Sequence, residues 1–374
     1  MYQRLYQEDR IEVAHGLDML AFCLFSLGRP ADALPAAEAA LAMNRRIHKG
    51  PHPDVAHGLE TLAGCFYYQG RSAEALTNLE ESLAMYRSIY KGDHPKTESL
   101  LNDCSLALDA AGRSEEALPK AEECLAMCQR LNAGDASETA NAFNNCAFCL
   151  EHLGRWSEAL PKYQAALEMA RRLYKGDDPN VALFNVHVGD CLHVLGLPDE
   201  ALQKYQDALA MFERLASAQP GNKLVRIGLV KTHFQFGNLW LGMGKPDEAN
   251  QNYQGGLDLA EAILAGDAAN PSATKLRLAC RIKLGLENSE VVLRKIFPAG
   301  QAREIGLQEG DVLVRYAAQP VVSALDLPFL TGSAKGNGIE LEIRREGAPL
   351  KLIANAGPLG ALCEDRVLPG KAPK

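Results

Sequence analysis

The sequence predicts a mainly α-helical protein in which helical hairpins stack into a right-handed α-α superhelix, followed by a small, mostly β-stranded domain. Two observations predict this architecture. A turn in which glycine is followed five residues later by alanine recurs at intervals of 42 residues, so a two-helix unit is repeated. Beyond Pro271 the apolar period changes from that of a helix to the alternation of a strand.

Composition and charge narrow the class of protein. The 374 residues are 47% hydrophobic and 23% charged, which is ordinary for a soluble globular chain. The net charge of −8 argues against nucleic acid or an anionic membrane as the partner. No window approaches eighteen uncharged apolar residues, and Met1 to Arg10 lack the apolar run of a secretory signal. We therefore expect a cytoplasmic protein.

One glycine marks the turn of each unit. These glycines are Gly28, Gly70, Gly112, Gly154, Gly196 and, after a longer interval of 48 residues, Gly244. The residues before each glycine have helical apolar spacing, and glycine commonly ends a helix, so the first helix of each hairpin stops there. Ser72, Ser114, Asp32 and Asp199 are the predicted caps of the second helices.

The second helix contains the alanine five residues after the glycine, whose small side chain lets the two helices approach closely. Pro53, Pro95 and Pro179 then open the next unit, at a helix position where a missing N–H costs little. A single hairpin cannot bury its apolar faces alone, so neighbouring hairpins must stack and share a continuous core.

Two further positions complete the repeat. Small residues stand seven positions before each glycine, and alanine, leucine or tyrosine nine positions after it. The whole pattern resembles the tetratricopeptide repeat, in the 42-residue form of kinesin light chains and related scaffolds. The resemblance implies a solenoid of six hairpins within residues 1–270, with a capping helix over residues 271–283.

The concave side of such a superhelix is lined by the first helices. We therefore expect the residues that stand 13, 10, 6, 3 and 2 positions before each glycine to form a partner-binding groove. The candidates are His15, Asp18, His57, Glu60, Tyr67, Tyr68, Asn102, Asp109, Asn141, Asn144, Glu151, His152, Asp190 and His193. Through the first five units these positions contain no lysine or arginine, which favours a protein or peptide with basic or aromatic and apolar anchors. The alternative is that these side chains pack between helices.

Ten cysteines and nine histidines raise the question of a metal site. Cys146 and Cys149 have the spacing of half a zinc site, and Cys124 and Cys128 lie one helical turn apart. The cysteines nevertheless recur at equivalent positions of different hairpins, as small buried hydrophobic residues would. No histidine pair has the sequence context of a zinc motif, so we expect no metal and no cofactor.

Catalytic motifs are also absent from the sequence. There is no GxSxG nucleophile turn and no GxxxxGK[ST] phosphate loop. The nearest grouping is His152 with Glu151 and Asn144, which has no nucleophile. We expect a protein that is not an enzyme.

The C-terminal region has its own motif. Phe297-Pro298-Ala299-Gly300, followed by Gly310-Asp311-Val312, resembles a PDZ domain over residues 284–356. In that family a loop binds the ligand carboxylate while the ligand adds a strand to the sheet, and Leu284, Gly285 and Leu286 resemble that loop. Only a few residues separate this loop from Val291, which predicts a truncated peptide-binding strand.

The last residues, 357–374, are expected to be a flexible tail. For the PDZ-like module, the alternatives to ligand binding are that it packs on the end of the solenoid or pairs with a second copy of the chain. The sequence as a whole predicts an adaptor that holds one partner in the groove and binds or positions another through the PDZ-like module. The alternative function is a regulatory subunit that docks a separately encoded protease, kinase or other effector.

Overall fold

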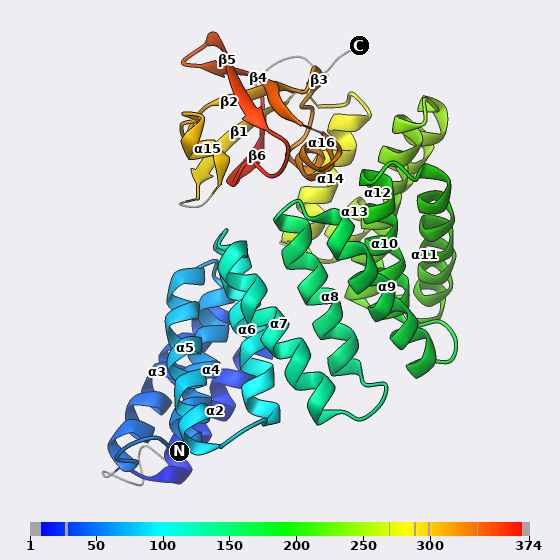
Figure 1. Ribbon diagram of the computed structural model, residues 1–374. Helices are drawn as coiled ribbons and strands as arrows, with labels where there is room; N and C mark the ends of the chain where they lie inside the picture. The colour runs from blue at the N-terminus through cyan, green and yellow to red at the C-terminus, as the bar shows by residue number, and fades with distance from the viewer. Residues whose placement is uncertain are drawn as a thin grey trace. The chain divides into compact units, whose positions relative to one another are not determined.

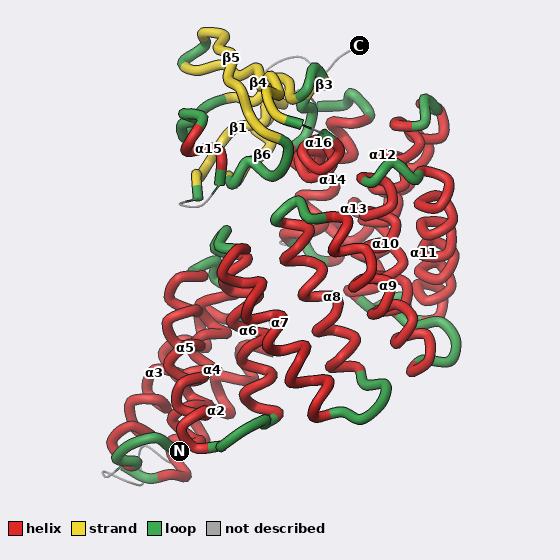
Figure 2. Tube along the Cα trace, in the orientation of Figure 1, coloured by secondary structure: helices red, strands yellow, loops and turns green. Residues whose placement is uncertain are grey.

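A computed structural model describes residues 9–26, 29–268, 270–287, 289–297, 300–334 and 336–368, without the side chains of Phe25 and Ser26. The chain divides into two compact units, Met1–Gly134 and Asp135–Lys374, which are described separately. Helices make up most of the chain, and the strands are confined to its C-terminal domain (Figure 2). Within the described ranges, no helix is both long and apolar enough to cross a membrane.

The described residues of the first unit form three helical hairpins (Figure 1). They are α2 (Ile11–Ser26) with α3 (Pro30–Ile47), α4 (Pro53–Tyr68) with α5 (Ser72–Ile89), and α6 (Pro95–Ala110) with α7 (Ser114–Leu131). Helix α3 packs against α4, and α5 packs against α6, so consecutive hairpins stack. The buried side chains between them are mainly alanine and leucine, as the repeat requires.

The second unit begins with three further hairpins. They are α8 (Ser137–His152) with α9 (Trp156–Leu173), α10 (Pro179–Val194) with α11 (Pro198–Ala218), and α12 (Lys223–Gly242) with α13 (Pro246–Gly266). Helix α14 (Pro271–Lys283) packs against α13 and buries Ala279 and Cys280 there. The predicted fold, hairpins that stack as in a tetratricopeptide solenoid, is therefore confirmed.

The turn glycines adopt the left-handed backbone conformation that lets a helix end abruptly. Gly70, Gly112, Gly154, Gly196 and Gly244 have φ between +69° and +78°. Gly28 lies outside the described residues. An added side chain would strain the backbone at any of these five turns, which explains why the repeat keeps glycine there.

The predicted caps are wrong, because Ser72, Ser114, Asp32 and Asp199 all lie inside the first turn of their helices. The N-cap residue, which directly precedes the helix, is an arginine in both α5 and α7, and within the described chain its side chain makes no cap hydrogen bond. Ser72 and Ser114 follow as the first helical residues. Each arginine instead pairs with a glutamate three residues later, Arg71 with Glu74 and Arg113 with Glu116. A glutamate in the first turn also complements the helix dipole, so the start of the helix is stabilised without a hydroxyl cap.

Ion pairs fasten the second helix of a hairpin to the segment that precedes its first helix. An arginine near the end of a second helix binds an aspartate 37 residues earlier with bidentate geometry. These pairs are Arg46–Asp9 and Arg130–Asp93 in the first unit, and Arg172–Asp135 and Arg214–Asp177 in the second. The second hairpin departs from this pattern, because Ser88 and Pro51 occupy the equivalent positions.

The C-terminal domain is one antiparallel sheet of six strands with short helices. The strands are β1 (Ser289–Ile296), β2 (Val312–Tyr316), β3 (Gln319–Pro320), β4 (Asn337–Arg345), β5 (Ala348–Asn355) and β6 (Ala361–Val367). The sheet order is β5-β4-β2-β1-β6, with β3 paired to β2. The helices are α15 (Gln301–Glu304), the 3₁₀ turn η1 (Ala324–Asp326) and α16 (Leu327–Ser333).

Strand β6 corrects the prediction of a flexible tail from residue 357. It pairs with β1 over seven positions, from Ser289 opposite Val367 to Ile296 opposite Ala361. Asp365 at its centre accepts hydrogen bonds from the Ser323 hydroxyl and the Ala324 amide. The domain therefore extends to at least Val367.

The β domain packs on the hairpins of its own unit through η1 and α16. Lys283 of α14 lies 2.7 Å from Asp326, and both side chains are only 10% exposed. The Phe329 ring lies 5.3 Å from the His193 ring. Gly332 is so close to Trp156 and Val194 that a Cβ atom would overlap both side chains. This packing is the alternative that the sequence left open for the module.

Candidate partner-binding surfaces

Helix α8 of the second unit carries a row of polar and aromatic side chains. The row consists of Asn141, Asn144, Phe148, Glu151 and His152, which share one face because they are three, four or seven residues apart. Asn141 and His152 are exposed, and the other three are half-buried. The rings of Phe148 and His152 lie 4.2 Å apart. This α8 face is thus a partly exposed surface that joins aromatic, amide and carboxylate groups.

Two neighbouring side chains hold the α8 face in place. The Tyr163 hydroxyl donates a hydrogen bond of 2.7 Å to Glu151. Asn144 Oδ1 lies 2.8 Å from Nδ1 of His187, a buried residue of α10. Burial lowers the pKa of His187 well below its ordinary value, so the ring is neutral and Nδ1 donates to the amide oxygen in the matching tautomer.

Asp190 in α10 is buried, with 3% of its surface exposed, which corrects the expectation that it lines the groove. It accepts a hydrogen bond of 2.6 Å from Tyr205, and the Lys231 ammonium lies 4.0 Å away. Burial raises the pKa of Asp190 to about 6. Its role is therefore within the hairpins. Tyr253 makes the matching contact to Asn238 at 2.8 Å.

His193 lies at a cavity of about 620 Å³ within the second unit. Helices α10, α12 and α14 contribute His193, Asn238 and Lys283 to its lining, and the β domain contributes Tyr316 and Phe329. His193 is half-buried, its Nδ1 atom has no hydrogen-bond partner in the described part of the chain, and burial lowers its pKa to about 4. The cavity is a second polar and aromatic surface beside the hairpins.

The first unit has an exposed aromatic and charged surface of its own. Tyr67 and Tyr68 are exposed, and their rings meet edge to face at 5.6 Å. Glu60 lies 3.7 Å from His57 and 3.5 Å from Lys96. The hydrogen bond to Glu60 raises the pKa of His57. This carboxylate is therefore already paired with cationic groups of the chain.

Other candidates of the first unit divide between surface and interior. His15 is exposed and Asn102 is half-buried. Asp18 and Asp109 are each only 8% exposed, which corrects their assignment to the groove. Asp109 accepts a hydrogen bond from Ser114 across the hairpin, and burial raises the pKa of Asp18. These two carboxylates belong to the packing between helices.

The predicted carboxylate-binding loop is wrong. The amides of Leu284, Gly285 and Leu286 donate to Cys280, Ile282 and Arg281 at the end of α14, with Gly285 at φ +68°. They therefore form a helix end and are not available to a ligand carboxylate. Strand β1 pairs with β2 on one side and with β6 on the other, so both of its edges are occupied.

The ten cysteines are all free thiols, and most of them are buried. Cys124 lies 3.5 Å from the Glu98 side chain, and its hydrogen bond with Cys128 is the largest of the effects that raise its pKa. A raised pKa disfavours the thiolate that a metal or a disulfide exchange would need. The structural interpretation of the cysteines fits this environment.

The hydrogen bonds from Tyr163, Tyr205 and Tyr253 to the first helices were not found from the sequence. The sequence signal was the tyrosine nine positions after the turn glycine in the last three hairpins. Its partner varies, from Glu151 to Asp190 to Asn238, and stands at two different distances from the glycine. A fixed spacing could therefore not reveal it.

Comparison with known proteins agrees with this repeat architecture. A family model described as tetratricopeptide repeat matches residues 9–88, 59–130 and 138–214, together more than half of the chain. The chain belongs to the tetratricopeptide repeat family.

Solved structures with a similar fold share little sequence with this tetratricopeptide repeat protein. A kinesin light chain protein of Podospora anserina with nearly identical TPR-like repeats has a TM-score of 0.50 and 17% identity, covering 57% of this chain and 99% of that one. BtubC (BKLC) from P. vanneervenii has a TM-score of 0.52 and 18% identity, covering 62% and 90%. The quorum sensor NprR in complex with its cognate peptide NprX has a TM-score of 0.53 and 14% identity, covering 75% of this chain and 76% of that one.

Curated relatives match only a short part of the tetratricopeptide repeat protein. A probable periplasmic serine endoprotease DegP-like from Pseudomonas savastanoi pv. phaseolicola is 38% identical over 69 residues, which are 18% of this chain and 14% of that protein. A second DegP-like protein, from Pseudomonas fulva, is 34% identical over 91 residues, which are 24% of this chain and 19% of that protein. The chain thus spans less than a fifth of the length of these relatives.

Proposed function

We propose that the protein is a non-enzymatic adaptor that binds a basic segment of a partner protein on the α8 face. The observation that carries this proposal is the half-buried Glu151, which shares the α8 face with the neighbouring rings of Phe148 and His152. A lysine or arginine can pair with the carboxylate while its stem or a neighbouring apolar side chain packs on the rings. Asn141 and Asn144 add amides that can hydrogen-bond a peptide backbone.

The chemistry of Glu151 differs from that of Glu60 in the first unit. Glu60 has His57 and Lys96 as cationic neighbours, whereas Glu151 accepts its hydrogen bond from the neutral Tyr163 hydroxyl. A hydroxyl orients the carboxylate without compensating its charge. This difference favours the second unit as the place where a basic partner binds.

The solved structure of NprR with its cognate peptide supports the kind of ligand, because that protein shares the repeat fold and binds a peptide. For the β domain we propose a positioning role. Its helix α16 packs on the hairpins, and both edges of β1 are paired within the chain. A second partner would then meet the β domain in a fixed position relative to the α8 face.

Peptide selection with the full chain tests the proposed function. A random peptide library is selected on the wild-type chain, and affinities of the enriched peptides are measured for Glu151→Gln and for Gln164→Ala. The first change keeps an acceptor for Tyr163 but removes the charge. Gln164 is exposed on α9 and serves as the matched control.

We expect lysine- or arginine-containing peptides whose affinity falls about tenfold in Glu151→Gln, a loss of about 1.4 kcal/mol, and is unchanged in Gln164→Ala. Enrichment of acidic peptides, or equal binding to all three proteins, would contradict the proposal. A regulatory subunit would use the same surface, and a partner enzyme whose activity changes on binding would distinguish that role from a passive adaptor.

A further inference from the structure

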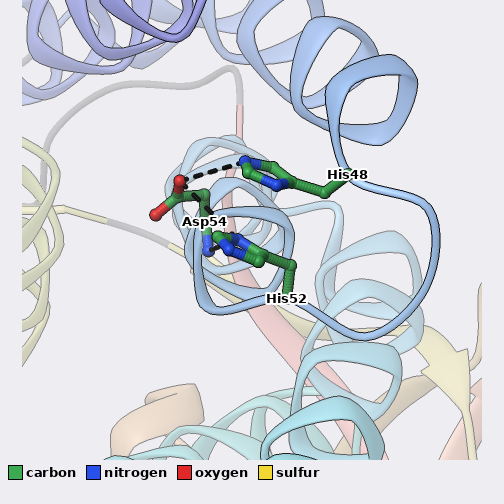
Figure 3. A group of neighbouring side chains, drawn as sticks. All are labelled: His48, His52 and Asp54. Carbon is green, nitrogen blue, oxygen red and sulfur yellow. Dashed lines mark hydrogen bonds and ion pairs between the residues drawn. The ribbon is translucent and has the colours of Figure 1, made fainter.

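The turn between α3 and α4 in the first unit brings two imidazoles and a carboxylate together (Figure 3). His48 ends α3, His52 caps α4, and Asp54 lies in the first turn of α4. One ligand atom from each residue falls within 4.8 Å of the others. Neutral imidazole nitrogens and a carboxylate oxygen are the donor set that Zn²⁺ takes in proteins.

The distances among these atoms suit a shared ion. His48 Nε2 lies 3.3 Å from Asp54 Oδ2, and His52 Nδ1 lies 3.6 Å from the same oxygen. His15 Nε2 in α2 is 3.7 Å from it. Two ligands bound to zinc at ordinary bond lengths with tetrahedral angles are about 3.4 Å apart. The carboxylate is therefore at ligand spacing from three imidazoles.

The repeat itself does not require this grouping. In the next turn of the same unit, Tyr90 and His94 stack at 3.7 Å as His48 and His52 do at 3.4 Å, so the ring stack belongs to the repeat. In the first turn, His48 stands where the second turn has Tyr90, and Asp54 stands where the second turn has Lys96. Each difference gives the first turn a metal-binding group, an imidazole or a carboxylate, at a position where the second turn has a tyrosine or a lysine.

A further difference concerns the arginine–aspartate ion pairs within hairpins. The second turn supplies Asp93 to Arg130, whereas Pro51 and Ser88 stand at the equivalent positions of the first turn and the next hairpin. The first turn therefore lacks the arginine–aspartate pair that the first, third, fourth and fifth hairpins have.

His48 Nε2 is a buried polar atom that makes no hydrogen bond among the described residues. Asp54 Oδ2 lies 3.3 Å away, and the two atoms form an ion pair without a hydrogen bond. Buried polar atoms normally have partners, so an unsatisfied nitrogen facing a carboxylate calls for an explanation. A metal ion between them would satisfy both.

We propose that His48, His52 and Asp54 form a Zn²⁺ site that fastens α3 to α4, with His15 as the nearest further ligand. The two imidazole rings are nearly parallel, so their nitrogens converge on one ion only after the rings rotate about χ2, a broad torsion. His52 Nδ1 then exchanges its 3.2 Å hydrogen bond with the Asp54 amide for the metal. The site is independent of the α8 face and of the proposed function.

Zinc binding to the untagged full chain tests the proposal. Affinity is measured by competition with a chromophoric chelator for the wild type and for His48→Tyr, which copies Tyr90 of the next turn. His52→Asn removes an imidazole but keeps a helix-capping side chain, and His94→Asn makes the same change in the second turn as the matched control. Co²⁺ serves as a spectroscopic probe that distinguishes cysteine thiolates from imidazole and carboxylate ligands.

We expect one Zn²⁺ per chain, with affinity reduced about tenfold or more in His48→Tyr and His52→Asn and unchanged in His94→Asn. Zinc should also raise the melting temperature of the wild type but not of the two site variants. The proposal is overturned if no ion binds, if His94→Asn weakens binding equally, or if Co²⁺ shows thiolate charge transfer from a site such as Cys124 and Cys128.

Discussion

The two sets of three hairpins use the same turn but differ at one interior position. Nine residues after the turn glycine, the first unit has Ala37, Leu79 and Ala121, whereas the second has Tyr163, Tyr205 and Tyr253. The tyrosine hydroxyls hydrogen-bond to polar groups of the first helices. The comparison teaches that the repeat determines the hairpin, while this one position decides whether a tyrosine hydroxyl joins the polar groups of its interior.

Tyrosine also needs space on the facing helix. A Cβ atom at Gly189 would be 2.9 Å from the Tyr205 ring, and one at Gly237 would be 2.5 Å from the Tyr253 ring. The equivalent residues in the first two hairpins are Ala21 and Ala63, opposite Ala37 and Leu79. In the last two hairpins the glycine therefore leaves room for the tyrosine ring, whereas the fourth hairpin has Ala147 at the position equivalent to Gly189.

The largest expected effect is the removal of the buried charge at Asp190. Its folded pKa of about 6 is above the ordinary value of 3.8 because of burial. The folded protein therefore binds a proton at Asp190 more tightly than the unfolded chain does. The stability that this contributes is fully present below the unfolded pKa and is lost as pH rises through about 6. Asp190→Asn should remove this slope and gain up to about 3 kcal/mol over the wild type at pH 7.

Denaturant unfolding of both proteins at pH 4 and pH 7 measures this difference. The two free energies of unfolding should be similar at pH 4 and diverge at pH 7. An identical pH dependence in the two proteins would show that Asp190 is not a buried titrating group.

A smaller loss is expected when the space opposite Tyr253 is filled. Gly237→Ala forces the new methyl group against the tyrosine ring and should cost about 2 kcal/mol. Adding Tyr253→Leu recreates the alanine–leucine pair of Ala63 and Leu79 and should recover part of that loss. Thermal unfolding of both single variants and the double variant gives the interaction energy, and strict additivity would show that residues 237 and 253 do not compete for the same space.

Packing of the β domain distinguishes the second unit further. Gly332→Ala should destabilise it by about 1 kcal/mol, because the methyl group would overlap Trp156 and Val194. Calorimetry together with tryptophan fluorescence checks the change, with Gly266→Ala as the control, because no atom of the described residues lies within 4 Å of that methyl group. A stability equal to the control would mean that α16 does not contact these residues in solution.

The smallest effect is a gain in the first unit. A methyl group added at Gly16 in α2 would have no atom of the described chain within 4 Å, so Gly16→Ala meets no obstacle there. Alanine is the better helix former, and we expect a gain of about 0.5–1 kcal/mol in chemical denaturation. A loss instead would indicate a contact that the open surface at this position does not suggest.

The repeat made the helical part predictable. Each turn glycine, each proline at a helix start and the capping helix follow from local backbone chemistry, which a single sequence contains. The α8 residues Asn141 and His152 were likewise identified by their distance from Gly154, and both are exposed.

Contacts between distant residues were not predictable in the same way. Asp18, Asp109 and Asp190 occupy groove positions of the pattern, but hydroxyl donors on a neighbouring helix hold Asp109 and Asp190 in the interior. Strand β6 was missed because its partner β1 is about 70 residues earlier and because three consecutive charged residues, Glu364 to Arg366, interrupt its apolar pattern. The His48, His52 and Asp54 group was missed because His52 has an ordinary repeat role.

The most direct test of where a partner binds is photo-crosslinking of a selected peptide to the full chain. A photoreactive amino acid is placed at Asn141 on the α8 face, at Gln164 on α9, or at Leu362 on β6, all of them exposed. We predict crosslinks from position 141 only, mapped by mass spectrometry. Crosslinks from position 362 and none from position 141 would contradict the account, because the β domain would then be the recognition surface.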